Sequence, residues 1–183
     1  MSVMTFPRTL ADQNRKITMI VDPVDNLESI SPTVLNGGIE LSCRATQADT
    51  RFAPSASETL SDPAVCEDAG ASTFGASQYE ATLGLFRFFD QENPGNGDPE
   101  GDSAYDALKI KGTEVVIVER HTNLRWDTPY AAGQEYRAFR VQVDNWVPAT
   151  EQHTGYIKGT FPMAVQSAAL NGVVAEDTPE DTP

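Results

Sequence analysis

Few residues of this 183-residue chain could do chemistry, and none stands in a pattern that an active site requires. His121 and His153 are the only imidazoles, and neither lies in a recognisable nucleophile context. The segment Gly75-Ala76-Ser77 lacks the preceding strand and following helix that a nucleophile elbow needs. The 27 Asp and Glu residues offer accidental carboxylate pairs, but no telling local pattern. We therefore expect a protein that is not an enzyme.

Candidate ligand sites are equally weak. Five acids lie between Asp90 and Asp102, yet their spacing does not match a calcium-binding loop. Two cysteines and two histidines without CxxC or HxxxH spacing do not predict a zinc site. The aromatic residues Trp126, Tyr130 and Tyr136 could form a carbohydrate platform, although core or rim packing explains them more simply. We expect no cofactor and no metal.

The charge of the chain restricts its partners. Thirteen basic and 27 acidic residues give a formal net charge of −14. Binding of DNA depends on Lys and Arg displacing counterions, so the net field opposes nucleic-acid binding. No apolar run approaches the roughly 20 residues that span a bilayer, and the N-terminus lacks the pattern of a secretory signal. Without that signal, Cys43 and Cys66 are expected to be free thiols.

The sequence pattern predicts a mainly β domain, a sandwich or barrel with one short flanking α-helix. Thirteen Gly and twelve Pro favour many short strands. We expect an N-terminal arm over residues 1–15, a domain over 16–170 and an acidic, flexible tail over 171–183. Within the domain, residues 45–74 form an extended loop that is too long to be idle. The expected strands are 16–21, 39–44, 78–90, 115–118, 135–144 and 154–166, and the expected helix is 103–111.

Alternation assigns faces to these strands. In 78–90, Tyr79, Ala81, Leu83 and Leu85 share one face, and the end near Phe88-Phe89 should be buried on both sides. In 135–144, the inward set is Phe139, Val141 and Val143, which leaves Tyr136, Ala138, Arg140 and Gln142 outward. Asn36-Gly37-Gly38 predicts a turn, and Pro162 predicts an edge or a bulge.

Several short motifs, taken in their order, resemble a known family. They are Pro63-Ala64-Val65-Cys66-Glu67, Gly75-Ala76-Ser77-Gln78-Tyr79-Glu80, the strand LFRFFD, the join ALKIKGTEVVIVER, and the segments Val143-Asp144-Asn145, Thr154–Lys158 and Phe161–Gln166. The chain is similar, over about residues 35–167, to the major tail tube proteins of long-tailed, non-contractile bacteriophages, especially those of actinobacterial hosts.

The resemblance implies a β-sandwich subunit that assembles into hexameric rings, stacked head to tail around a tape-measure protein. Such a protein belongs to the virion, is assembled in the host cytoplasm, and meets tail terminator and tail-tip proteins. The tube conducts double-stranded DNA without binding it specifically, and no membrane is involved. Candidate lumen-facing residues are Glu40, Ser42, Glu80 and Thr82. The candidate arm to the adjacent ring includes Thr50, Arg51, Phe52, Glu58, Leu60, Asp62, Glu67 and Asp68.

Other functions remain open at this point. The first alternative is a tail terminator or a head-decoration protein of similar fold. A terminator would cap one ring and would not polymerise into a tube. An extracellular β-sandwich module that binds carbohydrate would be a monomer whose Trp126 fluorescence responds to ligand. An enzyme that uses carboxylates is the third alternative, and no local pattern favours it.

Overall fold

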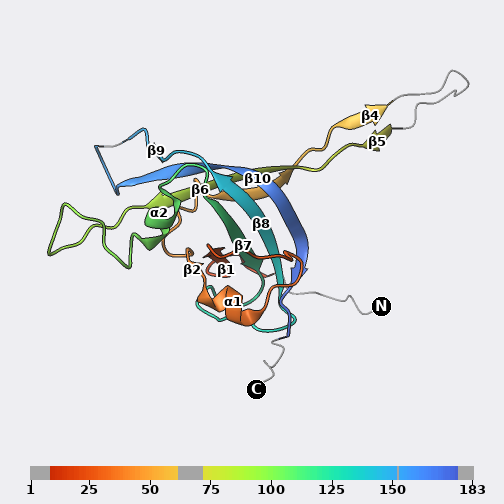
Figure 1. Cartoon of the computed structure of the whole chain (residues 1–183), viewed down its shortest axis with the longest axis horizontal. Helices are drawn as coiled ribbons and strands as arrows, with labels where there is room; N and C mark the ends of the chain where they lie inside the picture. The colour runs from red at the N-terminus through yellow and green to blue at the C-terminus, as the bar shows by residue number, and fades with distance from the viewer. Residues whose placement is uncertain (1–8, 62–71, 152, 177–183) are drawn as a thin grey trace, which may run out of the picture.

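One large antiparallel sheet dominates the computed structural model, which describes residues 9–61, 72–151 and 153–176 (Figure 1). Its strand order is β2-β1-β7-β8-β10-β6-β3, with β9 beside β10, and a separate two-stranded sheet is formed by β4 and β5. The mainly β class is confirmed. The strands are β1 (Arg15–Ile20), β2 (Ile39–Glu40), β3 (Arg51–Ser55), β4 (Thr59–Ser61), β5 (Ser72–Phe74), β6 (Gln78–Phe86), β7 (Glu114–His121), β8 (Glu135–Val143), β9 (Val147–Pro148) and β10 (Lys158–Val173); the helices are α1 (Pro32–Gly37) and α2 (Ser103–Leu108).

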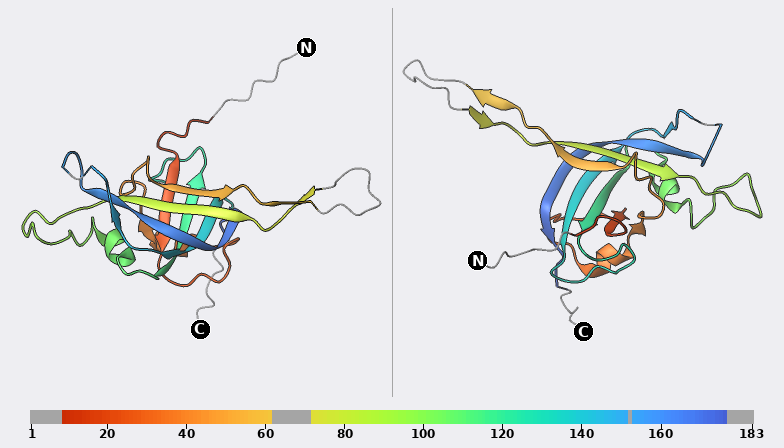
Figure 2. Two further views of the ribbon diagram at one scale, coloured as in Figure 1. Left: turned by 90° about the horizontal axis from the view of Figure 1, so that it is seen from above. Right: turned by 180° about the vertical axis from the view of Figure 1, so that it is seen from behind.

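The large sheet curls, and the chain after β2 joins its two sides. The Leu41 amide donates to the Ile17 carbonyl of β1 at 2.8 Å. A few residues later Ala45 bridges Leu85 of β6, and the Thr46 amide donates to the Gly84 carbonyl at 2.9 Å. As a result β6 and β3 cross over the inner face of β1, β7 and β8, as Figure 2 shows from above. The sheet therefore forms an incomplete barrel.

The first core fills this barrel. It combines Phe52 of β3, Leu83 of β6, Phe139 of β8 and Phe161 of β10, all nearly or fully buried. Alternation correctly assigned Ala81, Leu83, Leu85, Phe139, Val141 and Val143 to this face. Helix α2 closes one end, where it buries Leu108.

A second core lies on the opposite face of β7 and β8, and the sequence did not indicate it. Residues 24–37, including α1, cover Val116, Val118 and Ala138. Tyr136, expected to face outward, is 3% exposed; its hydroxyl accepts from the Ile30 amide and donates to the Leu27 carbonyl, both at 2.9 Å. The outward assignment of Tyr136 and Ala138 was therefore wrong, because a loop rather than solvent covers this face.

Some expected boundaries also differ. Asn36-Gly37-Gly38 ends helix α1, which Ser31 caps and Pro32 begins, so the described part of the chain has two helices rather than one. The strand expected over 39–44 stops at Glu40, and the helix expected over 103–111 stops at Leu108. The segment 45–74, expected as an extended loop with room for a short hairpin around Thr50 to Leu60, contains β3, β4 and β5. At the C-terminal end, β10 continues past residue 170 to Val173, and at the N-terminal end Arg15 already belongs to β1.

The expectations for one aromatic residue, Phe89, and for one proline, Pro162, need correction. Phe89, expected to be buried, is 40% exposed because β6 ends at Phe86 and the chain turns away. Pro162 lies inside the sheet, paired with Thr82 of β6, and not on an edge strand. The Pro162 carbonyl accepts from the Asp144 amide at 2.9 Å, just past the end of β8. The side of Pro162 that lacks an N–H therefore faces the end of β8 and not the ladder with β6. The missing donor thus costs no ladder bond.

Candidate assembly surfaces

A projecting hairpin is the most prominent surface feature. Strands β3 and β6 leave the barrel together and continue into β4 and β5, which pair Leu60 with Thr73 and extend away from the body (Figures 1 and 2). Leu60 is 52% exposed and Phe74 is 79% exposed. An isolated two-stranded hairpin is marginally stable in water, and burying such side chains against a neighbour would stabilise it. We call the described residues 56–61 and 72–77 the arm.

The candidate arm residues divide into three groups. Thr50 and Phe52 are buried in the body, where the Phe52 ring lies 5.8 Å from that of Phe139, so they anchor the arm. Arg51 is exposed at the root and pairs with Glu80 at 3.1 Å. On the arm itself, Glu58 and Leu60 are exposed. The remaining candidates, Asp62, Glu67 and Asp68, lie outside the described residues, as does Cys66.

The four candidate lumen residues come from two segments. Glu40 ends β2 and Ser42 follows it, whereas Glu80 and Thr82 lie on β6. Glu40 pairs with Lys16 at 2.9 Å and accepts from Ser42, whose hydroxyl also accepts from the Ile17 amide. Both are therefore occupied in holding the local turn, while Glu80 is exposed.

Strand β10 has an edge that no described strand covers. Its ladder with β6 stops at Met163, whereas its ladder with β8 continues to Val173 with two register shifts. The amides of Val173 and Ala175 donate to residues 28 and 30, which covers only the end of this edge. Residues 164–172 contain no charge and no proline. Proteins usually protect open edges with such residues, so this edge is unusually ready to pair.

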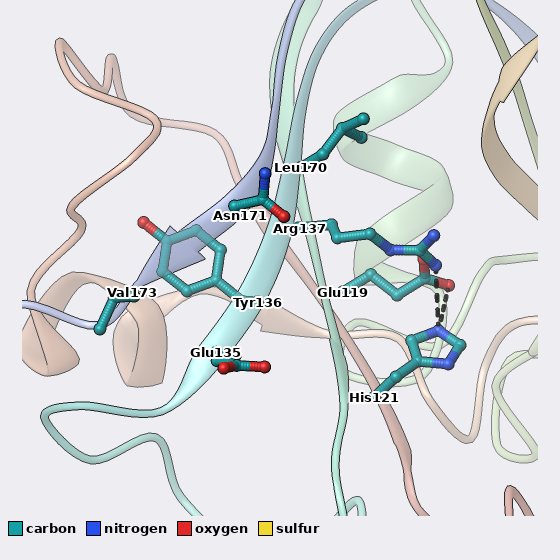
Figure 3. Close-up of a pocket in the computed structure, with 8 residues that line it drawn as sticks. All are labelled: Glu119, His121, Glu135, Tyr136, Arg137, Leu170, Asn171 and Val173. Atoms are coloured by element: carbon teal, nitrogen blue, oxygen red, sulfur yellow. Dashed lines mark hydrogen bonds and ion pairs between the residues drawn. The ribbon is translucent and has the colours of Figure 1, made fainter.

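A polar cluster lies at the end of the barrel away from α2, in a pocket of about 590 Å³ (Figure 3). Glu119 of β7 is 1% exposed and accepts from Arg15 and Arg137, each at 2.5 Å, while His121 lies 3.1 Å away. Burial alone would raise the pKa of Glu119, but the His121 hydrogen bond and the two arginine charges outweigh it and lower that pKa.

This cluster stabilises the barrel end and has no catalytic arrangement. The carboxylate is saturated by cations, and no Ser, Cys or Lys nucleophile lines the pocket. The neighbouring Arg120 is buried on the other face, where its guanidinium donates to the carbonyls of Arg125 and Pro129 and lies over Tyr130. Burial raises the pKa of Tyr130 to about 12. Sequence reasoning missed Glu119 and Arg120, although two charges at the end of the apolar run VVIV were a usable signal.

The acidic loop 90–102 uses its carboxylates in local bonds. Asp90 accepts from the Glu92 amide, Asp98 from the Gly101 amide, and Asp102 from Arg87 and the Phe88 amide. Asp102 therefore precedes α2 without capping it through its side chain. Among the described residues, no group of three or more His, Cys, Asp or Glu could hold a metal ion, and no helix is long and apolar enough to cross a membrane.

Comparison with known proteins identifies the family. No curated protein matches the chain. A family model described as phage tail tube protein matches residues 4–178, nearly the whole length. An exposed arm and an open sheet edge suit a structural component of a virion, and membership implies self-assembly into a tube without enzymatic activity. The chain belongs to the phage tail tube protein family.

Proposed function

We propose that this protein forms hexameric rings that stack head to tail into the tail tube of a long-tailed, non-contractile phage, and that the tube conducts double-stranded DNA. The observation that carries the proposal is the open edge of β10, together with the projecting arm, on a chain of the tail tube family. A folded chain that leaves both features uncovered gains by pairing with copies of itself.

Ring closure is assigned to the β10 edge. Unpaired N–H and C=O groups over residues 164–172 can continue a sheet into the neighbouring copy. Such a contact joins two different surfaces, so it repeats around a ring until the rotation closes. The edge strand β3 carries exposed Arg51 and Pro54, which protect it against the same kind of pairing.

Stacking is assigned to the arm, which reaches the adjacent ring. Thr50 and Phe52 anchor it in the barrel, and Glu58, Leu60, Asp62, Glu67 and Asp68 are its proposed contact residues. The remaining partners are the tape-measure protein inside the tube and the terminator and tip proteins at its ends. An actinobacterial host is part of the same proposal.

Our first candidate for the surface that lines the lumen is the outer face of β6, with Glu80 and Thr82. Glu40 and Ser42, at and just after β2, are a second and separate candidate. Six copies carry a formal charge of −84, six times −14. Two cations on the β6 side are neutralised, since Arg51 pairs with Glu80 and Lys158 with Asp49 at 3.3 Å. Cations held by carboxylates make fewer phosphate contacts, so DNA slides along the wall.

The test is electron microscopy of the purified, concentrated protein. We expect hollow tubes of uniform diameter with sixfold end views. Gln166→Lys places a charge on the open edge and should prevent rings, whereas Gln142→Lys, an exposed position on β8, serves as the matched control. Protein that stays monomeric at high concentration, or a Gln166→Lys variant that still forms tubes, contradicts the assignment.

A further inference from the structure

Six of the eleven large hydrophobic side chains that are exposed among the described residues lie at two opposite ends of the molecule. Leu60 and Phe74 lie on the arm. The second group is Val147 of β9, Tyr156 and Ile157 after β9, and Phe89 just past the end of β6. Figure 1 shows the β4–β5 hairpin at one end of the longest axis and β9 at the other. A monomer gains nothing from either group.

Tyr156 and Ile157 lie against the last residues of β6, and Val147 lies on the neighbouring strand β9. The Tyr156 ring packs edge-on against Phe86, with 5.6 Å between centroids, and is 81% exposed. The Arg87 amide donates to the Ile157 carbonyl at 2.9 Å, and Ile157 is 62% exposed. Val147 pairs with Thr160, close to the same segment. We call Phe86, Val147, Tyr156 and Ile157 the far-end patch.

Charge selects which surfaces the arm of another copy can approach. Residues 56–75 contain Glu58, Asp62, Glu67 and Asp68 and no Lys or Arg, so the segment carries −4. Most of the chain is acidic and repels it. Residues 152–175, by contrast, contain no Asp or Glu. Since Lys158 is paired with Asp49, this stretch is close to neutral and repels the arm least. Two protrusions share the far end, and the one with five acids, 90–102, is disfavoured for the same reason.

We propose that the far-end patch is the acceptor for the arm of a second copy, with Leu60 and Phe74 of the arm packed against Tyr156 and Ile157. The inference rests on the proposed stacking of rings and names the surface on which the arm ends. Because donor and acceptor lie at opposite ends of one subunit, the contact is heterologous and open-ended, and it extends along the tube axis. The contact also buries Leu60 and Phe74, and this burial stabilises a hairpin that has only marginal stability when it is free.

The first experiment uses charge substitutions at exposed positions, which preserve the fold. Tyr156→Glu with Ile157→Glu should reduce tube formation at least tenfold, as measured by sedimentation and microscopy. Val34→Glu is the matched control, because Val34 is a 42% exposed hydrophobic residue on α1, away from both ends. Thermal melting confirms that each variant is folded. A folded acceptor variant that forms tubes as well as the Val34→Glu control overturns the inference.

The second experiment mixes two defective proteins. The arm variant Leu60→Glu with Phe74→Glu keeps an intact acceptor, and the acceptor variant keeps an intact arm. Each alone should give unstacked rings, and the mixture should give stacks of two rings that do not grow. A mixture that stays unstacked shows that the two surfaces do not meet and overturns the inference.

These outcomes separate the inference from the proposed function. If wild-type protein forms tubes and the acceptor variant does so equally, the tube function stands and the acceptor surface is wrong. If wild-type protein forms neither rings nor tubes, the proposed function fails and the inference fails with it.

Discussion

Replacing Glu119 by Gln tests whether the polar cluster holds the open end of the barrel together. The substitution keeps the shape of the side chain and removes its charge. It leaves Arg15 and Arg137 without the carboxylate to which each is bonded at 2.5 Å, and it replaces one of the two accepting oxygens by an NH2 group that cannot accept.

The expected cost follows from burial. Removing one partner of a fully buried ion pair costs about 3–5 kcal/mol. The two arginine side chains are 27% and 33% exposed, so water can solvate them once the charge is gone. Allowing for this screening, we expect a loss of about 2–3 kcal/mol. For a chain of this size, that lowers Tm by roughly 5–10 °C.

The pH dependence has a defined sign. The folded-state pKa of Glu119 lies below the ordinary value of 4.5, so its contribution to stability is present above that pH and disappears as pH falls through the lower folded value. The amide that replaces the carboxylate in the Glu119→Gln variant cannot titrate. The difference in stability between wild type and variant should therefore be largest above pH 4.5 and should shrink in more acidic solution.

Urea denaturation at pH 7 and at steps below pH 4.5 measures both effects, at protein concentrations below those that form tubes. Glu135→Gln is the control, since Glu135 lines the same pocket but is exposed. An unchanged free energy of unfolding at pH 7, or a difference from wild type that does not shrink in acid, would refute the reasoning.

Three further predictions concern the arm and the lumen. Phe52→Ala should cost about 3–5 kcal/mol of stability in urea denaturation, because it removes a buried ring that packs on Phe139; a smaller loss than for an exposed Phe74→Ala control would contradict the anchor role. Replacing residues 57–76 by a short glycine linker should leave a folded protein that forms rings without tubes, and normal tubes in the microscope would disprove the arm. Glu80→Lys with Thr82→Lys should permit tubes but impair DNA delivery in an infectivity assay; unchanged infectivity counts against this lumen face.

The sequence predicted the parts of the fold that local alternation controls. Strands β6 and β8 and their inward sets, such as Leu83 and Phe139, followed from period two. The second core could not be read in this way, because Tyr136 and Ala138 are buried by a loop more than 100 residues earlier in the chain. A single strand pattern cannot indicate which distant segment covers its other face.

The candidate assembly residues remain a prediction, and the structure gives their positions. The length of segment 45–74 indicated an arm, and the structure assigns β3, β4 and β5 to it. The sequence could not separate buried anchors such as Phe52 from exposed positions such as Leu60, since both are single hydrophobic residues among polar ones. The open edge of β10 was also invisible, because it depends on where β6 diverges from its partner.

The root of the arm has a mechanical consequence. Because β3 and β6 continue directly into the hairpin, tension applied to its end acts along both strands. Antiparallel bonds run perpendicular to the strands, so this load shears the six-residue ladder between β6 and β10 all at once instead of opening it bond by bond. A tube held by such connections would resist being stretched, and bending it would strain each barrel before any subunit detached.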